Sequence, residues 1–342
     1  AFLCIWPPFL SDHILYISLP CAQDGIDCLL CQRFKTHCLH TAHIGSHIIA
    51  DGLCPLFSDA CHALHYGTSY FEGIRAYRCP AGGSAVFRLK DHMRRFLNSG
   101  KILGLPCAYD LPALEKAVID TLVANKLEAG YIRPLAFAGY GGMGVLPDGN
   151  PLQIIIAVWP WGAYLGAEGM DKGVRVKTSS FNRIHPNTLM SKAKAGGNYV
   201  NSVLAKMEAV QCGYDEALML DVQGFVSEAS GENIFIVRGN TLKTTPLTSV
   251  LEGINRDSLI KLARDMGYTV EEQLFTRDEL YSADEAFFCG TAAEVTPVRE
   301  VDGRTIGEGH AGPVTKAVQK AFFEVVDGTN GKYADWLAHY SF

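Results

Sequence analysis

The sequence predicts a mixed α/β fold, with α/β and α+β character, in two domains. Its 342 residues are enough to build two hydrophobic cores. From Ala85 onward, short segments rich in β-branched residues alternate with segments of helical spacing. A stretch rich in Trp, Gly and Tyr, over 159–169, interrupts this alternation. We therefore expect the chain to pass from one domain to the other there.

The first half is expected to contain strands and two long helices. Residues 85–89 have the composition of a strand, and Asp91 is a favourable N-cap for a helix over 92–104, because its carboxylate can accept a hydrogen bond from a backbone N–H. Helical spacing over 111–129, closed by Gly130, predicts the second helix. Two more strands and the glycine-rich loop between them follow at 131–138, 153–159 and 139–149.

The second half continues the same alternation. A strand is expected over 174–178, and a helix that starts near Asn198 and runs to Val210. Gly267 closes a later helix, because glycine readily takes the backbone conformation that ends helices. The remaining predicted elements are strands over 216–220 and 233–238, which flank a turn at 221–224, and helices over 255–266 and 312–326.

The composition is that of an ordinary globular protein, with 48% hydrophobic and 19% charged residues. A net charge of -6 and the absence of any Lys/Arg run argue against a nucleic-acid partner. The longest uncharged stretch after the N-terminal region, roughly 149–167, contains Pro151, Gln153, Pro160 and Gly162. It therefore fits a buried strand leading into a loop better than a membrane span.

The first fifty residues differ from the rest of the chain. Seven of the eleven cysteines lie in the first 61 residues, and Cys28 and Cys31 are followed by Cys38, His40, His43 and His47. This spacing fits no zinc ribbon or finger, so we expect no metal site. The remaining cysteines are scattered like the buried thiols of a reduced cytoplasmic enzyme.

Residues 1–50 are interpreted as an atypical, non-native or mis-assigned leader. A signal peptide is the alternative, since the segment 1–10 is apolar. No Lys or Arg precedes that segment, however, and none occurs before Arg33. The functional interpretation therefore begins at Asp51.

One motif carries chemistry: Lys194 lies among small residues, with Tyr199 five positions later and Glu228 farther along. A lysine amine can bind an aldehyde covalently, and a carboxylate can keep a pyridine nitrogen protonated, which suits a pyridoxal-phosphate enzyme. A tyrosine hydroxyl can bond the phenolic oxygen of the same ring. From the residues alone, nothing distinguishes Lys194 from Lys192, because either could be an ordinary solvated loop lysine. Glu228 could equally be a helix-capping or turn carboxylate.

Four long motifs resemble the bacterial branched-chain amino-acid aminotransferases, which are fold-type IV pyridoxal-phosphate enzymes. They are KAGGNY, SEASGEN, HALHYGTSYFEGIRAY (62–77) and CGTAAEVTPV (289–298). The resemblance runs from about Asp51 to KYADWL (332–337). It implies a small N-terminal α/β domain over 51–158, an interdomain loop over 159–173 and a large cofactor-binding domain over 174–342.

The resemblance assigns a catalytic role to Lys194 and cofactor contacts to a set of further residues. Lys194 would hold the cofactor at rest and act as the base at the substrate α-carbon. Two departures from the family pattern stand out: Asn255 replaces the usual threonine, which should weaken or rearrange a phosphate contact, and about five residues are missing before His62. The cofactor-binding residues implied are Arg95, Tyr199, Glu228, Gly253, Ile254, Asn255 and Thr291.

A pocket for an aliphatic side chain and for the carboxylate of glutamate is implied as well. Without the resemblance, its aromatic residues would be taken as ordinary core, whereas an arginine between strand residues, Arg133, usually has an anionic partner. Tyr66, Met143 and Val145 would come from the neighbouring subunit, which implies a homodimer or a higher homo-oligomer. The substrate-binding residues implied are Tyr66, Phe71, Tyr131, Arg133, Met143, Val145, Trp161, Tyr164, Thr291 and Ala292.

The expected activity is transamination of Leu, Ile or Val with 2-oxoglutarate by a ping-pong route, with pyridoxal 5'-phosphate as cofactor. Amino acids and 2-oxo acids would be the small-molecule partners, and the cytoplasm the location. D-amino-acid aminotransferase, aminodeoxychorismate lyase and amine transaminase are the alternatives within the same fold. An inactive binding protein is the alternative from another class. The joint presence of Lys194, Tyr199, Glu228 and Arg95 argues against it.

Overall fold

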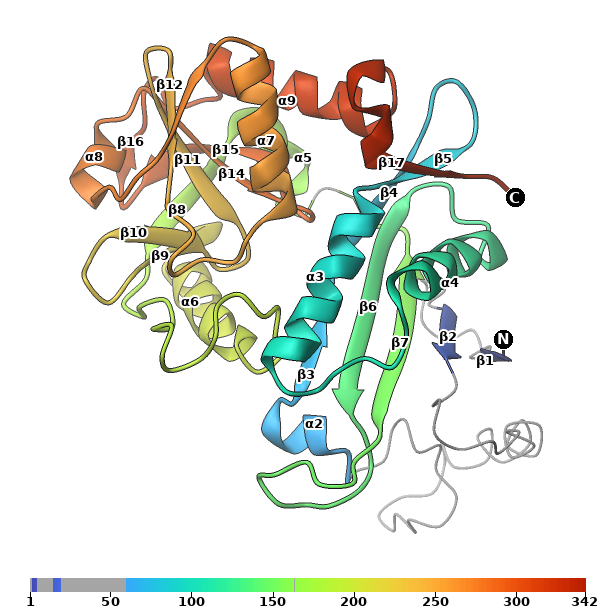
Figure 1. Cartoon of the computed structure of the whole chain (residues 1–342). Coiled ribbons are helices and arrows are strands. Elements are labelled where there is room, and N and C mark those ends of the chain that lie inside the picture. The colour runs from blue at the N-terminus through green and yellow to red at the C-terminus, as the bar shows by residue number, and fades with distance from the viewer. Residues whose placement is uncertain (1, 5–14, 20–59, 163) are drawn as a thin grey trace.

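The computed structural model describes residues 2–4, 15–19, 60–162 and 164–342. In these residues the chain forms two β-sheets, each with helices packed against it (Figure 1). The mixed α/β fold expected from the sequence is therefore confirmed.

The first sheet has eight strands, and each neighbouring pair is antiparallel. Its long central strands carry a buried face that receives two helices. The order along the sheet is β1 (Phe2–Cys4), β2 (Leu15–Leu19), β7 (Leu152–Trp159), β6 (Gly130–Ala138), β4 (Ile74–Arg78), β5 (Ser84–Phe87) and β17 (Leu337–Tyr340), with β3 (Ser69–Phe71) paired to β6.

Helix α3 (Leu89–Ile102) covers this sheet with an apolar face that includes Met93 and Phe96. The prediction that Asp91 caps a helix over 92–104 is wrong. The helix begins at Leu89, and Arg88 is its N-cap. Arg88 takes a left-handed backbone conformation (φ 48°), which turns the chain from β5 into α3 without a loop. Asp91 lies in the first turn and forms an ion pair with Arg88 Nε at 2.7 Å.

Helix α4 (Leu111–Ala124) packs beside α3 on the same sheet, and it is shorter than the predicted 111–129. Asn125 ends it, because its Nδ2 donates to the carbonyl of Thr121 at 2.7 Å. Lys126 then takes a positive φ of 52°, which a helix cannot continue. The chain enters β6 at Gly130.

The second sheet has nine strands, both parallel and antiparallel. The predicted strands over 174–178, 216–220 and 233–238 are found with the same bounds. The order along the sheet is β10 (Val226–Ala229), β9 (Glu216–Leu220), β8 (Val174–Thr178), β15 (Glu294–Val301), β14 (Glu285–Gly290), β11 (Asn233–Arg238), β12 (Thr241–Thr244) and β13 (Thr269–Glu272), with β16 (Arg304–Thr305) paired to β15.

Helices α7 and α9 bury one apolar cluster against the second sheet, around Phe235, Phe287 and Phe322. Helix α6 packs Ala205 and Ala209 against β9. The helices of this part are α5 (Gly166–Lys172), α6 (Tyr199–Gln211), α7 (Ile254–Asp265), α8 (Arg277–Tyr281), α9 (Pro313–Val326) and the 3-10 helix η3 (Gly331–Trp336); the short helix α2 (His62–Tyr66) belongs to the first half.

Two local predictions for the second half are wrong. The turn over 221–224 joins β9 to β10, whereas the sequence analysis joins it to β11. Strand β10 carries Glu228 and is only four residues long, so its alternation is too brief to indicate a strand. Helix α5 lies partly in the segment taken as an irregular bend, because its glycines hide the helical period.

The leader contributes β1 and β2 to the first sheet, where β2 pairs with β7. The sequence analysis does not foresee these strands. The cysteines and histidines of the zinc alternative, over 28–47, lie outside the described residues. The C-terminal strand β17 pairs with β5 at the opposite end of the strand order from β1 (Figure 1). The predicted domain boundaries at 158 and 174 stay a prediction.

Candidate active site

Lys194 lies where the chain runs along the free edge of β3. The N–H of Phe71 donates to the Lys194 carbonyl at 3.0 Å, and the N–H of Gly196 donates to the Ser69 carbonyl at 2.8 Å. A Cβ atom on Gly196 would lie 2.2 Å from Ser69 Oγ, so a side chain at this position would require the Ser69 hydroxyl to move. The small residues after Lys194 therefore allow its backbone to pack closely against β3, which fixes the position of the lysine.

The structure distinguishes Lys194 from Lys192. Lys194 Nζ donates to Tyr199 Oη at 2.8 Å, and no carboxylate of the described residues lies within ion-pair distance of it. Lys192 Nζ instead makes an ion pair with Glu252 Oε1 at 3.2 Å and also donates to backbone carbonyls. The amine of Lys194 is the one left for covalent chemistry.

Glu228 is buried and receives three hydrogen bonds. Arg183 Nε donates to Oε1 at 2.6 Å, while Asn233 Nδ2 and the N–H of Leu251 each donate to Oε2 at 3.2 Å. All three groups donate to the carboxylate, and one of them, the Arg183 guanidinium, carries a positive charge. Sequence reasoning missed Arg183, because nothing in its spacing links it to Glu228. Asn233 Nδ2 also donates to the Leu251 carbonyl at 3.2 Å.

Arg95 is held by a fully buried carboxylate. Its Nε and Nη2 donate to the two oxygens of Glu72 at 2.7 and 2.8 Å, and its Nη1 donates to the Glu252 carbonyl at 2.6 Å. Neighbouring Arg94 is exposed and pairs with Asp91 on the surface. This geometry favours Arg95 over Arg94 as the phosphate-binding residue.

Glu72 connects Arg95 to a second side chain, His92. Burial alone would raise the pKa of Glu72, but the charge of Arg95 and the hydrogen bonds from Arg95 and His92 hold it well below its usual range. Burial lowers the pKa of His92, so the imidazole is neutral and Nδ1 donates to Glu72 Oε2 at 2.7 Å. The guanidinium of Arg95 is thus fixed in orientation.

The N-terminus of α7 faces the same region. The first N–H groups of a helix have no partner within the helix, so those of Ile254 and Asn255 can bind an anion. A cavity of about 400 Å³ lies between α3 and α7; Arg95, Gly253 and Ile254 are among the residues that line it, whereas Lys194, Tyr199 and Glu228 are not. An arginine and a helix N-terminus are the groups that a phosphate needs.

Asn255 occupies the position of the family's threonine. Its Nδ2 donates to the Gly290 carbonyl at 2.9 Å, and its buried Oδ1 has no hydrogen-bond partner. The side chain therefore ties α7 to the turn after β14, which contains Thr291 and Ala292.

Glu232 lies close to that turn, against Gly290. It is buried, and a Cβ atom on Gly290 would lie 3.6 Å from its Cγ. Burial, and then the charge of Glu216, raise the pKa of Glu232 to about 8. Its carboxyl group is therefore mostly protonated at neutral pH.

Arg133 is a guanidinium without an anionic partner. Its carbon Cζ lies 4.5 Å from the ring centroid of Phe71 and 5.3 Å from that of Tyr131, and Nη2 donates to Tyr131 Oη at 3.3 Å. Its buried Nε makes no hydrogen bond, and no described carboxylate is within ion-pair distance. No carboxylate of the described residues occupies the place of the anionic partner expected for Arg133, which leaves its guanidinium able to bind an anionic ligand.

Four aromatic side chains lie in contact around Arg133 and the lysine. Tyr131 and Trp161 meet edge to face with centroids 4.5 Å apart, and Trp161 and Tyr164 do so at 5.7 Å. The ring centroids of Phe71 and Tyr199 are 4.9 Å apart, and Tyr199 Oη accepts a hydrogen bond from Lys194 Nζ, so the aromatic contacts extend to the lysine. The structure therefore brings together these four predicted substrate residues, Arg133 and the Lys194 group.

Tyr66, Met143 and Val145 form a separate, exposed group. Tyr66 Oη donates to the Met143 carbonyl at 3.1 Å, and His62 Nε2 lies 2.7 Å from the Gly144 carbonyl. These bonds join α2 to the glycine-rich loop. Val145 is 83% exposed, so the group is presented at the surface of the single chain.

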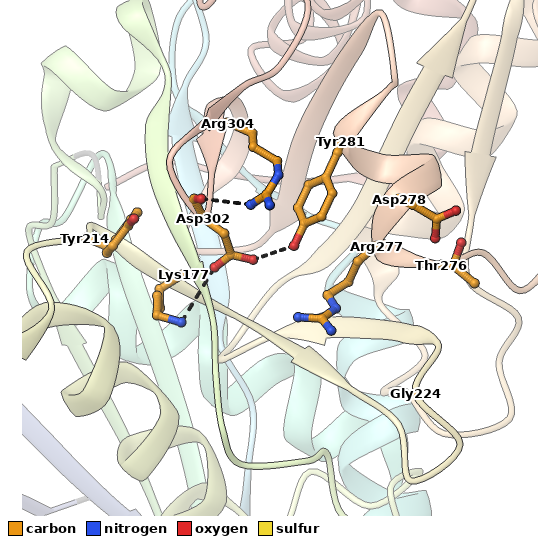
Figure 2. A pocket seen from close by; sticks show the side chains of 9 residues that line it. All are labelled: Lys177, Tyr214, Gly224, Thr276, Arg277, Asp278, Tyr281, Asp302 and Arg304. Atoms are coloured by element: carbon orange, nitrogen blue, oxygen red, sulfur yellow. Dashed lines mark hydrogen bonds and ion pairs between the residues drawn. The ribbon is translucent and has the colours of Figure 1, made fainter.

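A larger cavity, of about 630 Å³, lies elsewhere on the second sheet (Figure 2). Asp302 lies between Lys177 and Tyr281, and Tyr281 Oη donates to it at 2.8 Å. No predicted site residue lines this cavity, so size alone does not identify the active site. Its lining residues are Lys177, Tyr214, Gly224, Thr276, Arg277, Asp278, Tyr281, Asp302 and Arg304.

Residues 69–301 match the family model described as amino-transferase class IV. The chain therefore belongs to the class IV aminotransferases, whose members depend on pyridoxal 5'-phosphate. The residues present fit that cofactor: Lys194 offers an amine without a carboxylate partner, Glu228 a buried carboxylate, and Arg95 with the start of α7 an anion site.

Within this class the chain is similar over most of its length to branched-chain amino-acid aminotransferases, and it belongs with them. It is 48% identical to the enzyme of Pseudomonas aeruginosa over 275 residues, 80% of this chain and 89% of that protein. The Escherichia coli crystal structure matches with a TM-score of 0.80 and 49% identity, covering 82% of this chain and 93% of that one. The structure of the T.th. enzyme complexed with N-(5'-phosphopyridoxyl)-L-glutamate matches with a TM-score of 0.79 and 49% identity, covering 82% of this chain and 92% of that one.

Proposed function

We propose that this chain transfers the amino group of L-leucine, L-isoleucine or L-valine to 2-oxoglutarate in two half-reactions, giving a branched 2-oxo acid and glutamate. The observation that carries the proposal is that, within the described part of the chain, neither the Lys194 amine nor the nearby Arg133 guanidinium has a carboxylate partner; both lie over the ring of Phe71. The family to which the chain belongs favours this activity over the D-amino-acid and amine alternatives.

Pyridoxal 5'-phosphate, when bound, supplies an electron-accepting ring. Lys194 Nζ would hold the cofactor at rest, then accept the proton of the substrate α-carbon and return it. Tyr199 Oη orients that amine at 2.8 Å and would bond the phenolic oxygen. Glu228 would face the ring nitrogen and favour its protonated form. Arg95, Gly253, Ile254, Asn255 and Thr291 would hold the phosphate.

Two kinds of substrate would share one pocket. Phe71, Tyr131, Trp161 and Tyr164 supply apolar surface for a branched side chain. Arg133, with Tyr66 of a neighbouring subunit, would receive the distant carboxylate of glutamate. The backbone N–H groups of Thr291 and Ala292 would bind the α-carboxylate, which all these substrates share. The structure of the T.th. enzyme complexed with N-(5'-phosphopyridoxyl)-L-glutamate supports glutamate as one of the substrates.

The direct test is an assay of glutamate release from 2-oxoglutarate with different amino donors. L-leucine, L-isoleucine and L-valine should all support turnover, because the pocket combines apolar walls with an α-carboxylate site. D-alanine and a simple amine should not. Turnover with D-alanine or the amine, and none with L-leucine, would assign the chain to a sister activity of the same fold.

Replacing Arg133 by glutamine should raise the KM for 2-oxoglutarate by about 10- to 100-fold, because a charge-assisted hydrogen bond to the distant carboxylate is lost. The KM for L-leucine should change far less, since an aliphatic side chain makes no such bond. Steady-state kinetics with both substrates measure the difference. Arg78→Gln, in an exposed ion pair with Glu128, is the matched control. Equal rises in both KM values would contradict the proposed role of Arg133.

We also propose a homodimer in which Tyr66, Met143 and Val145 reach the neighbour's pocket. Helix α6 supports this, because it exposes an apolar stripe that a monomer would leave in water. The stripe starts one residue after Tyr199, so a partner covering it would lie close to the active site. Its residues, all more than 40% exposed, are Val200, Val203, Leu204, Met207 and Val210.

Replacing Val203 by aspartate should dissociate this dimer, because burying an unpaired carboxylate in an apolar interface is unfavourable. Sedimentation velocity should then change from dimer to monomer, and transamination should fall with it. Val222→Asp is the matched control, since Val222 is equally exposed (52%) but lies in the turn after β9. A wild-type chain that is monomeric and fully active would contradict the dimer.

A cytoplasmic location is part of the proposal. Among the described residues, Cys61, Cys79, Cys107, Cys212 and Cys289 are all free thiols, which suits a reducing compartment. Cys212 is exposed, which corrects the expectation that the scattered cysteines are buried. No helix in the described part of the chain is long and apolar enough to cross a membrane. Within the described residues, no cluster of His, Cys, Asp or Glu could hold a metal ion.

A further inference from the structure

We propose that Arg183 is a positioning residue that determines, through Glu228, whether the cofactor's ring nitrogen is protonated. This inference rests on the proposed function and on the assignment of Glu228 to the ring nitrogen. Arg183 lies in the segment between β8 and the Lys194 motif, and the sequence analysis assigns it no role.

The two side chains form a buried ion pair. Arg183 Nε donates to Glu228 Oε1 at 2.6 Å, and the side chains are only 8% and 6% exposed. Among the described residues, Arg183 is the only cation within ion-pair distance of Glu228. The other oxygen, Oε2, receives only the neutral amides of Asn233 and Leu251. In the described chain Arg183 is therefore the one cation that contacts Glu228 directly.

Arg183 is itself fixed from two sides. Its backbone N–H donates to the Leu220 carbonyl at 2.7 Å, at the end of β9. Its Nη1 approaches Asn201 Oδ1 at 3.3 Å and Ser202 Oγ at 3.5 Å, both on α6. Because α6 begins at Tyr199, the same guanidinium connects the helix of the tyrosine to the strand of the carboxylate.

A carboxyl group beside a pyridine nitrogen can share one proton in two ways. Either both groups are neutral, or the carboxylate is charged and the ring nitrogen protonated. In a buried site the neutral pair is favoured unless a further charge stabilises the carboxylate. Arg183 supplies that charge, so the proton goes to the ring nitrogen, where the electron-accepting ring needs it. Without Arg183, the proton should move toward Glu228.

The test uses the holoenzyme loaded with pyridoxal 5'-phosphate labelled with ¹⁵N in the ring. The ¹⁵N chemical shift reports directly whether that nitrogen is protonated. It should be in the protonated range in the wild type and in Arg183→Lys, and move toward neutral pyridine in Arg183→Gln. The kcat of Arg183→Gln should fall by roughly tenfold or more, with a smaller change in the KM for L-leucine.

Two further variants separate this role from a purely structural one. Arg183→Gln leaves Glu228 buried without a cation, which can impair folding. The double variant Arg183→Gln/Glu228→Gln removes both charges. Its ¹⁵N shift should equal that of Glu228→Gln alone, because the effect of Arg183 passes through Glu228. Arg175→Gln breaks another Arg–Glu pair (3.0 Å to Glu300), on β8, and should leave the shift unchanged.

Several outcomes would overturn the inference. One is a folded, cofactor-loaded Arg183→Gln with the wild-type shift. Another is Arg183→Lys with a neutral ring nitrogen, which would show that charge is not the determinant even if the glutamine variant cannot be folded. A wild-type shift in Glu228→Gln would instead remove the assignment of Glu228, and would leave the transaminase activity itself to be judged from turnover.

Discussion

Lys194→Ala should lower kcat by more than about 10⁴-fold, because one amine both holds the cofactor and moves the α-carbon proton. The fold should survive, since in the described structure Lys194 Nζ donates to Tyr199 Oη and has no carboxylate partner to leave behind. Circular dichroism should match the wild type. Borohydride reduction followed by mass spectrometry should attach the cofactor to the Lys194 peptide of the wild type and to no peptide of the variant.

Lys192→Ala is the matched control for this experiment. Lys192 lies two residues away and pairs with Glu252, which is itself 59% exposed in its side chain. Partly exposed ion pairs contribute little to stability, so this variant should keep its activity. Retained transamination in Lys194→Ala, or attachment of the cofactor at Lys192, would contradict the proposed catalytic role.

Arg95→Leu should have two separable effects. It removes the guanidinium proposed for the phosphate, so cofactor affinity should fall. It also leaves Glu72 fully buried without its bidentate partner, which should destabilise the apoprotein by about 3–5 kcal/mol. Titration with pyridoxal 5'-phosphate measures the first effect, and urea unfolding of the apoprotein measures the second.

The double variant Arg95→Leu/Glu72→Gln distinguishes the two roles. Neutralising Glu72 should recover most of the lost stability, because no buried charge remains unpaired. It should not recover cofactor affinity. Arg94→Leu, next in the chain but 54% exposed in its side chain, should change neither property. Wild-type cofactor affinity in Arg95→Leu would show that the phosphate lies elsewhere.

Much of the fold is predictable from local patterns, and the failures have physical causes. Strands β9 and β11 have buried apolar runs, and β8 alternates buried with half-buried residues, so these patterns mark their bounds. The start of α3 is misplaced because Arg88 takes a strained backbone conformation that no local pattern indicates. The pairing of β17 with β5 places Leu337 opposite Phe87, and local patterns cannot predict a contact between residues so far apart in the chain.

The site required more than local chemistry. The choice of Lys194 over Lys192 came from a resemblance, and the structure supplies its physical reason: Lys192 already has Glu252 and backbone carbonyls as partners. Arg183 and Glu72 went unrecognised, because each acts through a buried contact on a site residue that is distant in the sequence. Such partners become visible only when the elements that carry them are packed together.

The visible absorbance of the purified protein, with cofactor, before and after L-leucine is the most direct test of the proposed function. The account predicts a yellow protein whose band bleaches with L-leucine and returns with 2-oxoglutarate, since each substrate completes one half-reaction. A band that L-leucine leaves unchanged but D-alanine or an amine bleaches would contradict the branched-chain assignment. A protein that stays colourless with added pyridoxal 5'-phosphate would contradict the proposed site.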